Sequence, residues 1–159
     1  MNITIRKARP KDAALLTELN ADVQRHHAEA KPDLYKIPMP NDPALIAIYN
    51  ERLQTEGNFL FIAELNNESV GYIHCQIGGR EDNPFTVAFK VLIVNEVSVN
   101  ASHRGQGIGE MLMNKAYELA GELGISQITL GVHAFNEDAI RFYKRLGFEI
   151  TSIKMQKAL

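Results

Sequence analysis

The sequence is poor in cysteine and in long apolar runs, and each shortage excludes a class of protein. The single cysteine, Cys75, excludes an internal disulfide and a cysteine-based zinc cluster, and it fits a reducing compartment. No apolar run approaches the roughly 20 residues that a membrane span needs. Residues 1–11 alternate polar with apolar side chains and do not form a signal-peptide core. We therefore expect a cytoplasmic protein with no membrane partner.

Net charge is also low, at −2 from 17 basic and 19 acidic residues, so no global positive field attracts nucleic acid. The chain has 159 residues, of which 45% are hydrophobic and 23% charged. This is ordinary globular composition at a length that buries a core without metals or disulfides. We expect a single domain over residues 1–159, with no metal and no nucleic-acid partner.

The hydrophobic pattern predicts strands alternating with helices. Strands are expected at residues 3–8, 59–65, 70–77, 85–99, 127–132 and 148–155. Helices are expected from residue 10 until the pattern fades at His26 and His27, and at about 43–53, 108–123 and 136–146. Residues 78–84 are expected to form a loop. The resulting order β, α, α, β, β, β, α, β, α, β has no internal repeat and predicts a mixed α/β layer fold.

A glycine-rich loop follows the strand that ends at Val99 and precedes an amphipathic helix. The first N–H groups of a helix have no intrahelical acceptor, so they bind anions, and glycine lets a phosphate approach closely. Arg104 adds a fixed positive charge beside these groups. The pattern predicts a phosphate-bearing ligand at residues 104–109, whereas a flexible turn without a ligand remains the alternative.

The residues that the loop lacks decide which phosphate ligands are disfavoured. A Walker loop needs Gly-Lys-Ser/Thr where this chain has Gly109-Glu110-Met111. A dinucleotide fingerprint needs a further glycine where Glu110 stands, and it normally follows the first strand of the domain. ATP, GTP and dinucleotides are therefore not the expected ligands.

Two segments resemble motifs of the GNAT acetyltransferases. Arg104-Gly105-Gln106-Gly107-Ile108-Gly109 looks like the Arg/Gln-x-x-Gly-x-Gly/Ala signature of that family, preceded by the strand 95–99. Residues 134–148 are similar to its second motif, in which an asparagine, a helical tyrosine and a closing Gly-Phe recur. The resemblance is weakest before residue 59.

The resemblance implies a fold, a reaction and a set of cofactor-binding residues. The fold is a mixed, mostly antiparallel sheet with helices on both faces, splayed between the fourth strand, ending at Val99, and the fifth, ending at Val132. Acetyl-CoA would lie in the gap and acetylate a primary amine on a small molecule, a peptide N-terminus or a lysine. The implied contacts are Val97, Ser98 and Val99 for the pantetheine arm; Arg104, Gly105, Gln106, Gly107, Ile108 and Gly109 for the pyrophosphate; Asn136 for the pantetheine or the substrate side; and Tyr143 for the thioester sulfur.

Amide formation requires a proton acceptor, because a lysine-like ammonium has a pKa of about 10.4 and attacks only as the free base. Glu96 is the candidate general base, directly or through one water. Tyr143 is the candidate general acid for the leaving thiolate, and the backbone N–H of Val97 would stabilise the oxyanion. The alternatives are a solvent-facing or salt-bridged Glu96 and a Tyr143 that only packs in the core.

Other features carry weaker expectations. Cys75 is expected to be a small buried hydrophobe. His26 and His27 either line the acceptor pocket or form a solvated helix end, and His74, His103 and His133 are assigned no chemistry. The β-rich run 85–99 offers an edge for self-association, which suggests a homodimer. The rival to the enzyme is a non-catalytic acyl-CoA-binding regulatory module.

Overall fold

The structure, a computed structural model, describes residues 2–159 and is built around a five-stranded sheet in the order β1-β2-β3-β4-β5. The strands are β1 (Ile3–Lys7), β2 (Asn58–Leu65), β3 (Glu68–Arg80), β4 (Phe89–Val99) and β5 (Ile128–Leu130). Neighbouring strands from β1 to β4 are antiparallel, and β5 runs parallel to β4. The sheet is therefore mixed and mostly antiparallel, as the sequence predicts.

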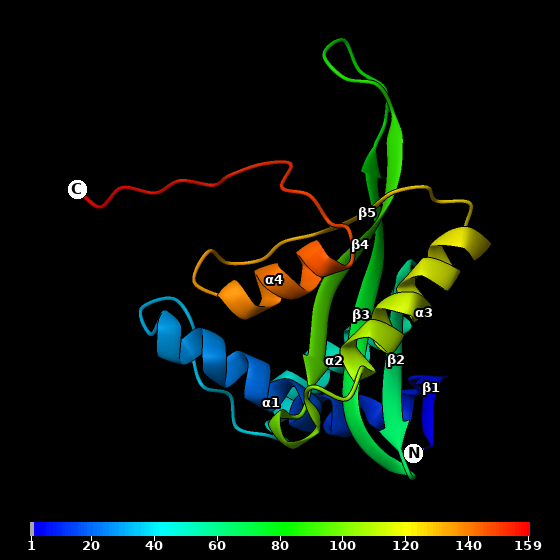
Figure 1. Ribbon diagram of the computed structural model, residues 1–159, viewed down its shortest axis with the longest axis vertical. Helices are drawn as coiled ribbons and strands as arrows, with labels where there is room; N and C mark the ends of the chain where they lie inside the picture. The colour runs from blue at the N-terminus through cyan, green and yellow to red at the C-terminus, as the bar shows by residue number, and fades with distance from the viewer. Residues whose placement is uncertain (1) are drawn as a thin grey trace.

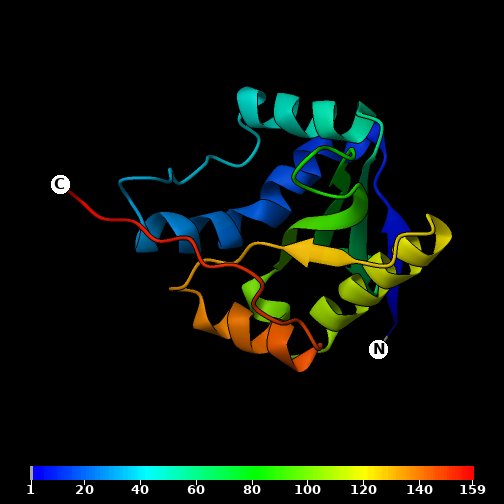
Figure 2. The same cartoon turned by 90° about the horizontal axis from the view of Figure 1, so that it is seen from above.

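Helices cover both faces of the sheet (Figures 1 and 2). The helices are α1 (Ala13–Ala30), α2 (Pro43–Gln54), α3 (Ile108–Glu122) and α4 (Glu137–Arg145), with short 3-10 helices at Pro10–Asp12 and Ala101–His103. Leu16, Leu19 and Tyr49 of α1 and α2 pack on one face, against β2 and β3. Side chains of α3 and α4 pack on the other face, in a larger apolar cluster. No helix within residues 2–159 is long and apolar enough to cross a membrane.

Two element boundaries differ from the prediction for physical reasons. Helix α1 continues through His26 and His27 to Ala30, because Ala28 is buried and extends the packed face of the helix. The predicted loop at residues 78–84 begins too early, because β3 continues to Arg80, and it ends too early, because β4 begins at Phe89 rather than at residue 85. A Cβ on Gly79 would lie 2.1 Å from the Phe89 carbonyl oxygen, so this glycine permits close strand pairing.

The strand predicted at residues 148–155 is not formed. This segment leaves the body of the molecule as an extended tail (Figure 1). Its apolar side chains Ile150, Ile153 and Met155 are 66%, 79% and 89% exposed. Alternation specifies a strand only where a neighbouring strand and a buried face exist, and β5 offers just three residues at the sheet edge.

Candidate active site

A β-bulge in β4 determines which way Glu96 points. His74 of β3 lies opposite Glu96, but the next β3 residue, Cys75, lies opposite Val94, so Asn95 is an extra residue on β4. An inserted residue reverses the alternation of side chains that follow it. Glu96 therefore faces α1 and α2, whereas Val94 before the bulge belongs to the cluster under α3.

Three polar side chains, those of Arg52, Tyr72 and Tyr49, lie within hydrogen-bond distance of the Glu96 carboxylate, and Asn20 holds one of them. The Nη1 of Arg52 donates to both carboxylate oxygens at 3.0 and 3.1 Å, and the Tyr72 hydroxyl donates to Oε2 at 2.5 Å. Tyr72 is fully buried, gives its one hydroxyl proton to Glu96 and accepts from the Asn20 amide at 2.9 Å. Tyr49 lies 2.8 Å from the Tyr72 hydroxyl and completes the network. The side chain of Glu96 is 25% exposed, which keeps it within reach of a substrate.

This network was not foreseen from the sequence. Arg52 and Tyr49 lie on α2, three residues apart and on one helix face, and Tyr72 comes from β3. An arginine and a tyrosine at that spacing are ordinary on a helix surface. Only the packing of α2 on β3 and β4 brings them to Glu96. The salt bridge that the sequence left open as an alternative is present.

The sheet is splayed next to Glu96. Strand β5 pairs with β4 only from Leu92 to Val94, and the chain beyond β5 diverges. The Asn100 N–H donates to the Val70 carbonyl at 2.8 Å, and hydrogen-bonded pairs alternate along an antiparallel ladder. The backbone N–H and C=O groups of Val97 and Val99 therefore face away from β3, into the opening. The gap expected between the fourth and fifth strands is thus confirmed, although β5 ends at Leu130 rather than at Val132.

The loop that leads into α3 presents a row of amides without acceptors. The first amide of the helix with a backbone acceptor is that of Met111, which donates to the Gly107 carbonyl at 3.0 Å. Within residues 2–159, no hydrogen bond is made by the N–H groups of residues 105–110. Six consecutive free donors at the positive end of a helix dipole suit a phosphate group. The residues present therefore fit the pyrophosphate of coenzyme A.

The individual loop residues have separable local roles. Gly105 and Gly107 adopt positive φ angles of 75° and 79°, a conformation that favours glycine. Ile108 is buried and anchors the start of α3 in the core. Gly109 has another constraint, because a Cβ there would lie 3.3 Å from the Phe142 ring of α4. Gln106 is exposed beside them.

Arg104 lies at the start of this loop and bridges it to β4. Its Nε donates to the Val99 carbonyl at 3.1 Å, which agrees with that carbonyl facing the opening. In the described part of the chain, the terminal guanidinium nitrogens make no hydrogen bond or ion pair. The side chain is therefore held beside the free amides with charged donors to spare for phosphate oxygens.

Helix α4 carries the two remaining predicted residues. The Asn136 side chain accepts from the Ala139 N–H at 3.2 Å, so its carbonyl oxygen caps the helix and its amide nitrogen is the group left for a ligand. Tyr143 packs edge-to-face with Phe142 and Phe148, at ring centroid distances of 5.1 and 5.7 Å. Burial, with a smaller contribution from Tyr117, raises the pKa of Tyr143 to about 12, so its hydroxyl keeps its proton at neutral pH.

Three further side chains near the site are buried and have structural surroundings. The Ser98 hydroxyl donates to the Leu19 carbonyl at 2.6 Å and fastens α1 to β4, so only its backbone remains for a cofactor. Cys75 is fully buried, and burial raises the pKa of its thiol to about 12, which confirms the packing role. Burial lowers the pKa of His74 to about 4, and its Nδ1 has no hydrogen-bond partner.

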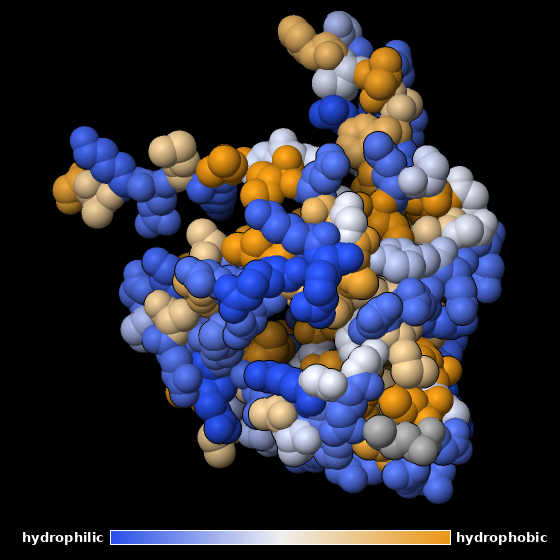
Figure 3. Space-filling model, in the orientation of Figure 1, coloured by the Kyte–Doolittle hydropathy of each residue, from blue (hydrophilic) through white to orange (hydrophobic). Residues whose placement is uncertain are grey.

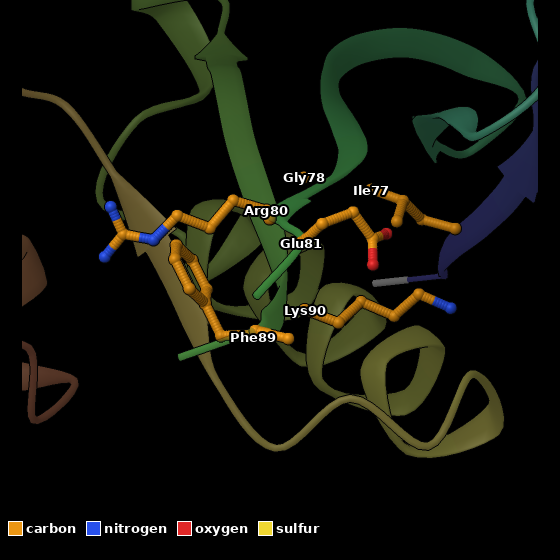
Figure 4. A pocket seen from close by; sticks show the side chains of 8 residues that line it. Ile77, Gly78, Arg80, Glu81, Phe89 and Lys90 are labelled. Atoms are coloured by element: carbon orange, nitrogen blue, oxygen red, sulfur yellow. The ribbon is translucent and has the colours of Figure 1, made fainter. Parts of the chain in front are cut away.

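A surface depression of about 640 Å³ lies elsewhere, along the β3–β4 hairpin. In Figure 4 the Arg80 guanidinium lies near the Phe89 ring, 4.8 Å from its centroid, while Glu81 and Lys90 extend to the other side. The lining includes neither Glu96 nor any residue of the glycine loop. This depression is therefore separate from the residues predicted for catalysis and cofactor binding.

Comparison with known proteins agrees with this geometry. The acetyltransferase (GNAT) family description matches residues 20–148. An uncharacterised N-acetyltransferase of Methanocaldococcus jannaschii is 39% identical over 92 residues, which cover 56% of this chain and 38% of that protein. The chain spans less than half the length of this and two further curated relatives, of which 36% and 37% are covered.

Two solved structures show the same fold. The tetramutant of the BH1408 protein from Bacillus halodurans has a TM-score of 0.92 at 22% identity, with 98% of this chain and 99% of that chain covered. An aminoglycoside N-acetyltransferase, AAC(6')-Iy, in complex with CoA has a TM-score of 0.78 at 19% identity, with 99% and 95% covered. Because the matched residues include β4, the glycine loop and α4, the chain belongs to the acetyltransferase (GNAT) family.

Proposed function

We propose that this protein transfers the acetyl group of acetyl-CoA to a primary amine. The observation that carries the proposal is the open edge of β4, where the backbone groups of Val97 and Val99 adjoin the free amides of residues 105–110. An extended pantetheine arm would pair with that edge while the pyrophosphate binds the loop and Arg104. Glu96 and Tyr143 then flank the position of the thioester from β4 and α4.

The reaction is a direct displacement at the thioester carbon. The amine nitrogen loses a proton to Glu96, directly or through water, and its lone pair forms the C–N bond. The Val97 N–H stabilises the oxyanion of the tetrahedral intermediate. When the C–S bond breaks, the thiolate takes the electron pair and is stabilised by a hydrogen bond from the Tyr143 hydroxyl, and the proton that Glu96 took from the amine passes through water to the thiolate. The products are an amide and free coenzyme A.

Arg52 has a defined part in this scheme. Its Nη1 holds both oxygens of Glu96, and the Tyr72 hydroxyl fixes one of them, so the carboxylate is oriented before the amine arrives. A proton taken from the amine would weaken the attraction between Glu96 and Arg52. The hydrogen bond from Tyr72 limits how far the carboxyl group then moves.

The same ion pair favours a second candidate function. A carboxylate held in place by Arg52 is less free to turn toward a substrate amine, and the protein would then be a non-catalytic acyl-CoA-binding module. The two functions differ in turnover and not in cofactor binding.

Release of free thiol from acetyl-CoA over a panel of primary amines separates the two functions, with coenzyme A binding checked by thermal shift. We expect amine-dependent thiol release that Glu96→Gln abolishes, and unchanged stabilisation by coenzyme A. Stabilisation without turnover on any amine would instead favour the binding module.

A further inference from the structure

Five aromatic rings from three segments gather at the end of α1. They form what we call the ring cluster: His26 and His27 on α1, Tyr35 in the loop after it, and His133 and Phe135 between β5 and α4. Phe135 stacks on His133 at 5.1 Å with an interplanar angle of 11°, and it also contacts the rings of His26 and His27 at 5.8 and 6.0 Å. His27 contacts all four other rings, and Phe135 contacts three of them.

The cluster lies on the side of the sheet to which Glu96 points. The negative charge of Glu96 reaches His27 and opposes a pKa that burial, His133 and His26 together lower. In Figures 1 and 2 the chain that leaves β5 passes the end of α1 before it turns into α4. Figure 3 shows that the surface between α1 and α4 is hollowed and has apolar residues at its bottom. The rings therefore lie on the same side of the sheet as Glu96, at the end of α1 that adjoins this hollow.

Core packing does not account for these rings. None of them belongs to either apolar core cluster, His26 and His133 are exposed, and the other three are half-buried. Within residues 2–159, no three histidine, cysteine or acidic side chains are grouped so as to hold a metal ion. The Tyr35 hydroxyl lies 2.6 Å from His133 Nε2, which joins the two loops across the cluster. A gathered, partly exposed aromatic surface of this kind suits contact with a ligand.

The chemistry of the cluster favours a flat ring over a polycation. No hydrogen bond or ion pair joins its side chains to a carboxylate in the described part of the chain, and nearby Glu96 is already paired with Arg52. An acceptor with several ammonium groups would find no carboxylate paired with the rings themselves, and any protonated imidazole would repel it. Aromatic faces and edges instead pack favourably against another planar ring.

We propose that the ring cluster is an acceptor-binding wall that selects primary amines carrying a planar aromatic ring on a short alkyl chain. The ring of such an amine packs against Phe135 and its neighbours while its nitrogen reaches Glu96. This inference rests on the acetyltransferase function proposed above for the choice of an amine as the ligand. It adds the class of acceptor, which no contact of Glu96 itself specifies.

Tryptamine is a direct probe, because the chain contains no tryptophan and indole fluorescence reports only the ligand. We expect tryptamine to bind more tightly than putrescine, an aliphatic diamine. Phe135→Leu should raise the tryptamine dissociation constant by about two- to tenfold, the range expected for loss of one aromatic contact. Phe85→Leu makes the same chemical change at a ring that is 95% exposed on the β3–β4 hairpin, and it should leave binding unchanged.

Kinetic constants separate recognition from a general loss of structure. Phe135→Leu should raise KM for tryptamine and leave KM for acetyl-CoA unchanged. If putrescine binds as well as tryptamine, or if Phe135→Leu and Phe85→Leu behave alike, the inference is overturned. Thermal shift with coenzyme A distinguishes failure of this inference from failure of the acetyltransferase proposal. Stabilisation by coenzyme A without selectivity for aromatic amines refutes only this inference. Selective binding of tryptamine without stabilisation by coenzyme A refutes the acetyltransferase proposal and supports the aromatic binding site.

Discussion

Replacing Tyr143 by phenylalanine isolates the contribution of one hydroxyl to the proposed reaction. The ring packs against Phe142 and Phe148, and phenylalanine keeps both contacts. Within residues 2–159 the hydroxyl makes no hydrogen bond. The substitution should therefore change the free energy of unfolding by less than about 0.5 kcal/mol. A large effect on turnover would then reflect the reaction step and not a loss of stability.

The pKa of Tyr143 sets the size of that effect. Burial raises it to about 12, whereas an ordinary thiol has a pKa of about 8.5. Complete proton transfer from this phenol to a thiolate is therefore uphill by about 4–5 kcal/mol. A hydrogen bond to the developing thiolate avoids this cost and contributes about 1.5–3 kcal/mol. We expect Tyr143→Phe to lower kcat by about 10- to 150-fold.

The assay is thiol release from acetyl-CoA at saturating amine, with coenzyme A affinity measured separately. Because the pKa of Tyr143 is raised, its hydroxyl stays protonated below about pH 11. Ionisation of Tyr143 should therefore not lower the wild-type kcat below that pH. The dissociation constant for coenzyme A should stay the same in Tyr143→Phe. Unchanged kcat would refute the role of the hydroxyl, and weaker coenzyme A binding with normal kcat would make Tyr143 a binding residue only.

Three further predictions concern stability and the cofactor loop. Tyr72→Phe removes a buried hydroxyl with three hydrogen-bond partners, so chemical denaturation should show that the free energy of unfolding falls by about 2–4 kcal/mol. Tyr49→Phe should lower it by about 1 kcal/mol. Equal losses would contradict the larger structural contribution of the Tyr72 hydroxyl. Gly107→Ala should cost about 1–2 kcal/mol because of its positive φ and should weaken coenzyme A binding, whereas Gly121→Ala, within α3 with open space around it, should not destabilise. Because the His74 pKa falls from 6.5 to about 4 on folding, the unfolded chain binds more protons between these values, and stability should rise with pH across that window by about 3 kcal/mol. His74→Phe should flatten this slope, and an unchanged slope would assign it to other groups.

Local signals predicted most of the scaffold and the cofactor loop. Gly107 at the start of α3, Gly124 after its end and the Asn136 cap of α4 are each specified by neighbouring residues, and the structure has the predicted helices there. The loop predicted at residues 78–84 is wrong at residues 78–80, because glycines in a hairpin also permit close strand pairing. The strand predicted at residues 148–155 failed because alternation carries no information about a partner strand.

The surroundings of Glu96 depend on contacts between distant segments, which a single sequence does not reveal. Its orientation follows from the bulge at Asn95, and no residue type in β4 marks that bulge. Arg52 reaches it across 44 positions of sequence. The sequence leaves open whether His26 and His27 line the acceptor pocket or form a solvated helix end, and it assigns His133 no chemistry, so it does not predict the ring cluster.

The central claim is that free amides of residues 105–110, together with Arg104, hold the pyrophosphate of acetyl-CoA. Titration calorimetry with acetyl-CoA and with acetyl-pantetheine, which lacks the phosphates, tests it directly. The account predicts saturable binding of acetyl-CoA that is largely lost with acetyl-pantetheine and is weakened by Arg104→Ala. Equal affinity for the two thioesters, or no binding of acetyl-CoA, would contradict it.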